Sequence, residues 1–225
     1  MESQRRLFGC GLWSIWLDRN RNLYEGKTQS GIGVANFTKN YIRELDCLIE
    51  RKNTFVGEKE NWKPPDGQSI KFNFDAPFDC LGLKSASGIV ARNANGEVLA
   101  FNSGLHTAVG TAFDAEALPC FEAVLTGIEL GLTDVIVEGD SRSIITKCNT
   151  GSVDKSQISA HIRNIQKENK SFRSLVFHFV SRSANQLAHN IAMMSLKKKE
   201  TIYLMGGVPR YAQRRLEMER PREAY

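Results

Sequence analysis

The first part of the chain repeats its apolar residues at helical spacing. Apolar side chains between Trp13 and Tyr24 recur at three- and four-residue steps, which predicts a short amphipathic helix. Residues 37–53 predict a second helix, with Tyr41 and Leu45 on one face. These two segments therefore form a helical flank at the start of the chain.

After this flank the pattern changes. Residues 57–68 are polar and contain Pro64-Pro65-Asp66-Gly67, a strong stop signal, so they predict a linker. From Ile70 the apolar residues alternate with polar ones, as in Ile70, Phe72 and Phe74, which predicts a half-buried strand.

Two further strands are expected over residues 87–92 and 97–101. Asn95-Gly96 lies between them, and this dipeptide is a strong short-range signal for a β-hairpin. The globular part of the chain therefore opens with three antiparallel strands.

The remaining pattern predicts four helices and two more strands. The helices are expected over residues 112–130, 141–148, 156–168 and 184–196, and the strands over residues 134–138 and 175–180. The resulting order βββαβααβα predicts an α/β fold, in which three antiparallel strands are followed by parallel α/β units. We expect a mixed five-stranded sheet flanked by helices.

Composition agrees with one globular domain and flanks. The chain has 225 residues, of which 41% are hydrophobic and 24% are charged. We expect an N-terminal helical flank and linker over residues 1–61, the α/β domain over 62–196 and a basic C-terminal tail over 197–225. The net charge of +5 comes from the flanks, so it indicates nucleic-acid binding only weakly.

Targeting and cysteine signals are weak. The five cysteines are odd in number and form no C-x-x-C pair, which argues against a zinc site or a disulfide framework. The apolar run from Leu7 to Leu17 is interrupted by Asp18-Arg19-Asn20-Arg21, and no apolar stretch reaches about 20 residues. We therefore expect an intracellular protein, nuclear or cytoplasmic, with no membrane partner.

Three acidic residues lie where rigid elements can position them. Asp75 and Asp140 end predicted strands, and Glu116 lies early in a predicted helix. Hydrolysis of phosphodiesters by two metals needs carboxylates fixed on such elements. Each acid also has an ordinary alternative: a turn aspartate before Pro77, a first-turn helix acid, and an N-cap.

The phrases around these residues resemble a known family. KFNFDAPF around Asp75, FDAEALPCFEA around Glu116, VIVEGDS around Asp140 and ANQLAHNIA around His189 are together similar to ribonuclease H. The tryptophan-rich phrase LWSIWLDRNRNLYEG is similar to the segment that precedes this domain in plant retroelement polyproteins. The chain therefore resembles the plant retroelement-derived, reverse transcriptase-like branch of the family.

This resemblance implies a ribonuclease H-like fold and a specific activity. It implies a divalent-metal-dependent endonuclease that hydrolyses the RNA strand of RNA–DNA hybrids, with Mg²⁺ or Mn²⁺ in a two-metal site. Asp75, Glu116, Asp140 and His189 are the implied catalytic residues and metal ligands. Arg182 lies in a phrase similar to V-P-R-E-A-N of the family and is a candidate contact to phosphate, with a solvated loop charge as the alternative.

Two departures from the family pattern leave the activity open. His189 stands where the family usually has aspartate, which removes one negative charge and disfavours magnesium. Pro119 follows Glu116 in the same predicted helix, so that helix either begins late or kinks beside the site. A rival interpretation is therefore a catalytically impaired module that binds nucleic acid or protein, and a third is a non-functional retroelement fragment.

Overall fold

The computed structural model describes residues 2–26, 28–52, 60–79, 82–150 and 159–220. The chain divides into two compact units, residues 1–55 and residues 56–225. Parts of the predicted linker (57–59) and of the predicted helix over 156–168 (156–158) lie outside the described residues. Among the described residues, no helix is both long and apolar enough to cross a membrane.

The first unit is a pair of packed helices. Helix α1 spans Glu2–Glu25 and helix α2 spans Gly31–Lys52. Trp13 of α1 lies against two aromatic rings of α2, with ring centroids 6.0 Å from Phe37 and 4.7 Å from Tyr41. Both predicted helices are present, and α1 starts well before the residues that the apolar pattern had indicated.

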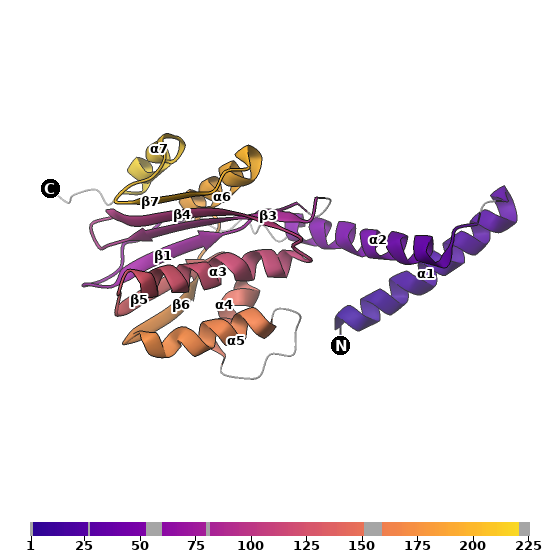
Figure 1. Ribbon diagram of the computed structural model, residues 1–225, viewed down its shortest axis with the longest axis horizontal. Helices are drawn as coiled ribbons and strands as arrows, with labels where there is room; N and C mark the ends of the chain where they lie inside the picture. The colour runs from indigo at the N-terminus through magenta and orange to yellow at the C-terminus, as the bar shows by residue number, and fades with distance from the viewer. Residues whose placement is uncertain (1, 27, 53–59, 80–81, 151–158, 221–225) are drawn as a thin grey trace. The chain divides into compact units, whose positions relative to one another are not determined.

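The second unit is built on a seven-stranded mixed sheet in the order β6-β5-β1-β3-β4-β7, with β2 paired to β3 (Figure 1). Strands β5 and β6 run parallel to β1, and β3, β4 and β7 continue the sheet with antiparallel pairing. The strands are β1 Ile70–Asp75, β2 Phe78–Asp79, β3 Lys84–Arg92, β4 Val98–Thr107, β5 Asp134–Gly139, β6 Ser174–Phe179 and β7 Ile202–Met205.

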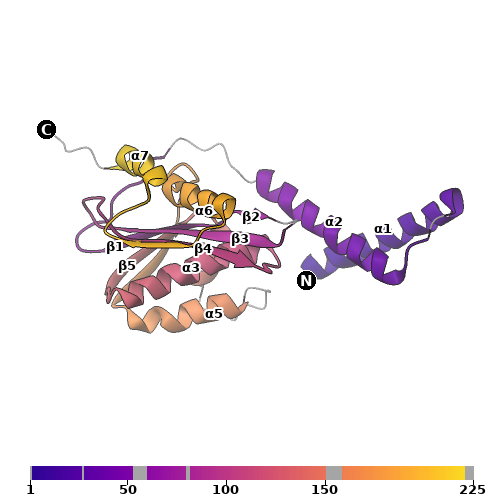
Figure 2. The same ribbon diagram turned by 45° about the horizontal axis from the view of Figure 1, so that its top comes forward.

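Helices cover both faces of this sheet. Helices α3, α4 and α5 lie on one face, and α6 and α7 on the other (Figures 1 and 2). The helices are α3 Ala112–Glu129, α4 Arg142–Asn149, α5 Ser159–Glu168, α6 Gln186–Lys198 and α7 Arg210–Glu219, and a 3₁₀ turn spans Asn169–Ser171. The predicted α/β fold with a mixed sheet and flanking helices is confirmed.

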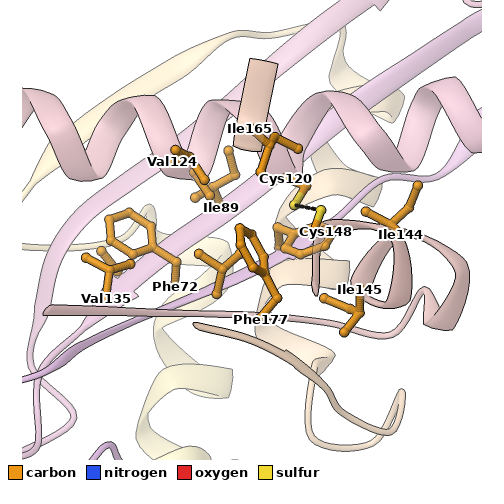
Figure 3. Packing of buried hydrophobic residues seen from close by; sticks show 14 of the residues in the cluster. Phe72, Ile89, Cys120, Val124, Val135, Ile144, Ile145, Cys148, Ile165 and Phe177 are labelled. Atoms are coloured by element: carbon orange, nitrogen blue, oxygen red, sulfur yellow. Dashed lines mark hydrogen bonds between the residues drawn. The ribbon is translucent and has the colours of Figure 1, made fainter. Parts of the chain in front are cut away.

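The larger hydrophobic core lies between the sheet and helices α3, α4 and α5 (Figure 3). Phe72 and Phe74 of β1 are fully buried in it, together with Val137 of β5 and Cys120 of α3. A smaller core on the opposite face joins β3 and β4 to α6 and α7, through Val90 and Phe101 of the strands among others. Each apolar face of the sheet is therefore covered, as a stable layered domain requires.

The sheet has two strands more than the five that were expected. Strand β2 is short and pairs with β3. Strand β7 comes from the segment that was expected to be a basic tail, and it pairs antiparallel with β4. Gly206 follows β7 with φ 70°, a conformation that favours glycine, and its N–H donates to the Leu99 carbonyl at 2.9 Å.

Helix α3 begins at the residue that the sequence pattern predicted, well before Pro119. The helix begins at Ala112, capped by the Thr111 side chain, which accepts from the Asp114 N–H at 3.1 Å. Pro119 is buried inside this helix, and Glu116 lies in its second turn. The alternative in which the helix begins late is therefore wrong.

Candidate metal site

Asp75 is the last residue of β1. Its neighbour Phe74 points into the larger core, so the alternation of the strand directs Asp75 to the opposite side. The Asp75 side chain is only 1% exposed. A carboxylate this deeply buried needs cationic or hydrogen-bonding partners, because desolvation disfavours its charged form.

Asp140 directly follows β5, the parallel neighbour of β1. Parallel strands end at the same edge of a sheet, which brings Asp140 close to Asp75. Ser141, not Asp140, is the N-cap residue of α4. Burial raises the pKa of the Asp140 carboxyl, and the charge of Asp75 raises it further, while Arg182 opposes both effects without cancelling them.

Glu116 reaches the same place from helix α3. One carboxylate oxygen from each of Asp75, Glu116 and Asp140 lies within 4.8 Å of the other two. Three acids from a strand, a helix and a strand end thus converge in space, although 65 residues of sequence separate the first from the last. The structure brings together the three acids that the sequence had singled out.

Arg182 lies directly against two of these acids. Its Nη1 donates to Asp75 Oδ1 at 3.1 Å and to Asp140 Oδ2 at 2.8 Å. Burial by itself lowers the pKa of this guanidinium, but the charges of Asp75 and Asp140 outweigh that effect and raise it above its ordinary value. Arg182 is therefore a charged partner of the acids rather than a solvated loop residue.

His189 lies beside Asp75 on helix α6. Its Nδ1 is 2.7 Å from Asp75 Oδ2, and Arg182 Nη2 lies 2.7 Å from Nδ1 and 3.2 Å from Nε2. Because a carboxylate accepts, the Nδ1–Asp75 hydrogen bond places the proton on Nδ1, so the approach of Arg182 Nη2 to the same nitrogen is a contact between two donors. His189 therefore contacts Asp75 and lies outside the mutual 4.8 Å group of the three acids.

Sequence reasoning missed the part played by Asn185. Asn185 is 1% exposed, and its Nδ2 donates to the Phe74 carbonyl at 2.8 Å and lies 3.4 Å from Asp140 Oδ1. Asn185 precedes α6 and so reads as a helix cap, but its side chain makes no capping hydrogen bond. It instead ties the start of α6 to the ends of β1 and β5.

The other histidines lie apart from this cluster. His106 Nε2 lies 2.5 Å from the Ser87 hydroxyl and 3.5 Å from Glu122 Oε1. His161 lies on α5 and lines a cavity of about 410 Å³, and His178 is exposed on β6. Each belongs to a packing or surface environment.

Comparison with known proteins agrees with this geometry. A sequence model described as reverse transcriptase-like matches residues 73–195, more than half of the chain. The chain belongs to the reverse transcriptase-like family. The match includes Glu116, Asp140, Arg182 and His189 and starts two residues before Asp75.

Solved structures identify the fold of this reverse transcriptase-like chain. The N-terminal RNase H domain of a Mycobacterium tuberculosis protein superposes with a TM-score of 0.54 at 19% identity, over 59% of this chain and 96% of that one. RNase H1 from the archaeon Halobacterium salinarum gives a TM-score of 0.50 at 20% identity, over 58% and 98%. No curated protein matches the chain in sequence. The fold is therefore RNase H-like, while the predicted plant and retroelement origin stays a prediction.

The donor set fits a divalent cation of a particular kind. All three clustered ligand atoms are carboxylate oxygens, and oxygen ligands suit hard cations such as Mg²⁺ and Mn²⁺ rather than thiolate-preferring metals. The acids are fixed on β1, α3 and the end of β5, so the site is largely preformed. An acidic cluster able to hold a divalent metal is thus present in this RNase H-like domain.

Proposed function

We propose that the protein is a divalent-metal-dependent endonuclease that hydrolyses the RNA strand of RNA–DNA hybrids. The observation that carries this proposal is the convergence of Asp75, Glu116 and Asp140 within 4.8 Å at the carboxyl edge of parallel strands in an RNase H-like fold. The two superposed structures, both described as RNase H, support the choice of substrate.

The acids, His189 and Arg182 would have different roles in this reaction. Asp75, Glu116 and Asp140 would hold Mg²⁺ or Mn²⁺, which when bound supplies an activated water and neutralises charge on the phosphate. His189 completes the site from α6, where its Nδ1–H holds Asp75 at 2.7 Å. Arg182, whose Nη1 faces the acids and whose Nη2 faces His189, would donate to a phosphate oxygen of the substrate. Hybrid recognition would use the 2′-hydroxyl and the minor groove rather than base edges.

The test is cleavage of an end-labelled RNA–DNA hybrid by the purified full chain, in Mg²⁺ and separately in Mn²⁺. We expect RNA cleavage that the Asp75→Asn variant loses by a factor of at least about 100, since one metal ligand loses its charge. A matched duplex of DNA alone should stay intact. Cleavage that persists undiminished in Asp75→Asn would contradict the proposal.

A second function is favoured by one specific observation. Arg182 already donates to two of the three acids, and His189 replaces a fourth acid, so the site carries less negative charge than four carboxylates would. A module that binds the hybrid without cleaving it is compatible with this arrangement. Hybrid binding by folded protein, with no cleavage in either metal, would favour the binding module over the nuclease.

A further inference from the structure

Helix α7 reaches the site through a chain of hydrogen bonds that begins in a buried ion pair. Arg92 of β3 is 1% exposed and Glu219 of α7 is 6% exposed, and Arg92 Nη1 lies 2.8 Å from Glu219 Oε2. Burial lowers the pKa of Arg92, and the charge of Glu219 opposes that effect. A buried cation of this kind needs its partner, so the pair fixes α7 on the sheet.

The second oxygen of Glu219 orients Arg215. Arg215 Nε donates to Glu219 Oε1 at 2.7 Å, one helical turn away on α7. In this orientation Arg215 Nη2 donates to the carbonyl of Ser183 at 3.3 Å. Ser183 directly follows Arg182 in the turn between β6 and α6, so α7 contacts the segment that carries the cation of the site.

The same ion pair is also linked by hydrogen bonds to the two strands that lead to Asp75 and Asp140. Arg92 Nη2 donates to Asn73 Oδ1 at 2.8 Å, and Asn73 Nδ2 donates to Glu138 Oε2 at 3.1 Å. Asn73 and Glu138 are partners in the register of β1 and β5, and each precedes a site acid by two residues. The network therefore joins α7 to the site from the turn and from the strands.

We propose that Arg215 is a positioning residue of the metal site, which holds the Ser183 carbonyl so that Arg182 stays between Asp75 and Asp140. This inference rests on the proposed metal-binding function. It assigns α7, which follows the family match ending at residue 195, a part in that function. Arg215 touches no reacting group and acts through the turn 181–185.

The direction of the effect follows from charge. Arg182 donates to carboxylate oxygens that a divalent ion also needs, so the guanidinium and the ion compete for them. Without Arg215 the turn loses the hydrogen bond to the Ser183 carbonyl, and Arg182 is held less firmly. The hydrogen bonds of Arg182 to Asp75 and Asp140 are then weaker, so a metal ion displaces the guanidinium more easily. Mn²⁺ affinity should therefore rise when either Arg182 or Arg215 is removed.

The test is a double-mutant cycle on the full chain, with the dissociation constant of Mn²⁺ measured by titration calorimetry. We expect Arg182→Ala to tighten Mn²⁺ binding about tenfold and Arg215→Ala about two- to fivefold, with no added effect of Arg215→Ala in the Arg182→Ala background. Arg215→Lys should behave like Arg215→Ala, because lysine lacks the planar fork that reaches both Glu219 and Ser183.

Arg214→Ala is the matched control, because it removes one exposed positive charge from the same helix. It should leave Mn²⁺ affinity unchanged within about twofold. An Arg215→Ala effect of equal size with and without Arg182, or an effect matched by Arg214→Ala, would show a general charge effect and overturn the proposal.

A second readout separates this proposal from the proposed function. In ¹⁵N-arginine NMR spectra, the hydrogen bonds that Arg182 Nη1 donates to Asp75 and Asp140 slow rotation about the Cζ–Nη1 bond and resolve its proton signals. These signals should be present in the wild type and in Arg214→Ala, and should broaden in Arg215→Ala. If the wild type binds no Mn²⁺, the proposed function fails, and unchanged Arg182 signals in Arg215→Ala would still overturn the positioning role.

Discussion

At the residue scale, Arg182 is a cation that lies directly against the acids of the site. Its Nη1 faces oxygens of both Asp75 and Asp140, at 3.1 and 2.8 Å. Near a protein surface a pair of unit charges at about 4 Å interacts by roughly 4 kcal/mol, so each contact matters. A divalent cation carries twice the charge of a guanidinium, so it can compete with Arg182 for the same oxygens.

His189 offers a direct test of how much negative charge the site needs. Replacing His189 by Asp places a fourth carboxylate beside Asp75 and within reach of Arg182. Because Mg²⁺ prefers oxygen ligands, we expect His189→Asp to tighten Mg²⁺ binding about tenfold, or roughly 1.4 kcal/mol, and to raise cleavage in Mg²⁺ relative to Mn²⁺. Titration calorimetry and the hybrid cleavage assay measure the two effects.

The control for this substitution is His189→Asn, which keeps a donor for Asp75 without adding charge. It should leave the Mg²⁺-to-Mn²⁺ preference within about twofold of the wild type. A His189→Asp variant that folds, binds no more Mg²⁺ and gains no cleavage would indicate a scaffold without a working metal site.

Cys120 should be inert to thiol reagents in the folded protein. Its side chain is fully buried, with Sγ 3.9 Å from Cys148 Sγ, and burial raises its pKa well above the ordinary value (Figure 3). Only the thiolate reacts, so a raised pKa lowers the reactive fraction at any given pH. At pH 8 we expect N-ethylmaleimide to modify Cys120 on the order of 100-fold more slowly than the partly exposed Cys10.

Peptide mass spectrometry of samples quenched over time checks this, with urea-unfolded protein as the control in which the two rates converge. The difference should persist as the pH rises through the ordinary thiol range near 8.5, because the folded-state pKa lies above it. Equal labelling rates of Cys120 and Cys10 in folded protein would show that the larger core opens readily.

The site residues differ in how far the sequence could predict them. Asp75, Glu116 and Asp140 each lie in a short phrase at a strand end or in a helix, so local pattern and family resemblance located them. Arg182 was predicted as a phosphate contact. Its contacts to Asp75 and Asp140 depend on the geometry of an irregular turn, which the spacing of apolar residues does not predict. Asn185 had no predicted role, and only the fold shows that its amide reaches the Phe74 carbonyl.

At the scale of elements, the same contrast holds. Apart from the two-residue strand β2, the strands and helices up to α6 have clear two-residue or helical periods, so their order could be predicted. Strand β7 and helix α7 were not expected, because both are stabilised by partners far away in sequence. Arg92 and Glu219 are 127 positions apart, and an acid near the end of a charged segment gives no sign in the sequence that it will be buried.

Close packing of α6 on β3 makes Gly88 a sensitive position. A Cβ at Gly88 would lie 2.3 Å from the Ala188 carbonyl oxygen and 2.6 Å from the Ala192 nitrogen, both backbone atoms of α6. Helix α6 carries His189, so it cannot move without changing the site. We expect Gly88→Ala to lower the free energy of unfolding by about 1–3 kcal/mol and to weaken Mn²⁺ binding.

Gly104 on the adjacent strand β4 is the matched control. A Cβ there would meet its nearest atoms at 3.6 Å, an ordinary contact, so Gly104→Ala should be neutral or slightly stabilising. Urea unfolding measures both variants. Equal stability of Gly88→Ala and the wild type would mean that α6 and β3 are less tightly packed than the structure shows.

At the scale of the whole molecule, the chain is two units with separate interiors. The helical pair α1–α2 has its own aromatic cluster of Trp13, Phe37 and Tyr41. Every residue of the candidate metal site and of the two larger hydrophobic cores lies within residues 56–225. The two units should therefore unfold independently, and the metal site should need only the second.

Deleting residues 1–55 tests this division. Because the remaining chain keeps the full sheet, α7 and the Arg92–Glu219 pair, we expect it to fold, to keep its midpoint of thermal unfolding within about 3 °C, and to bind Mn²⁺ within about twofold of the full chain. Circular dichroism and calorimetry measure both. A truncation at residue 199, which removes β7 and α7 instead, should unfold at a clearly lower temperature, since it leaves Arg92 buried without its partner. If the N-terminal deletion were the more damaging of the two, the metal site would depend on the helical pair as well as on residues 56–225.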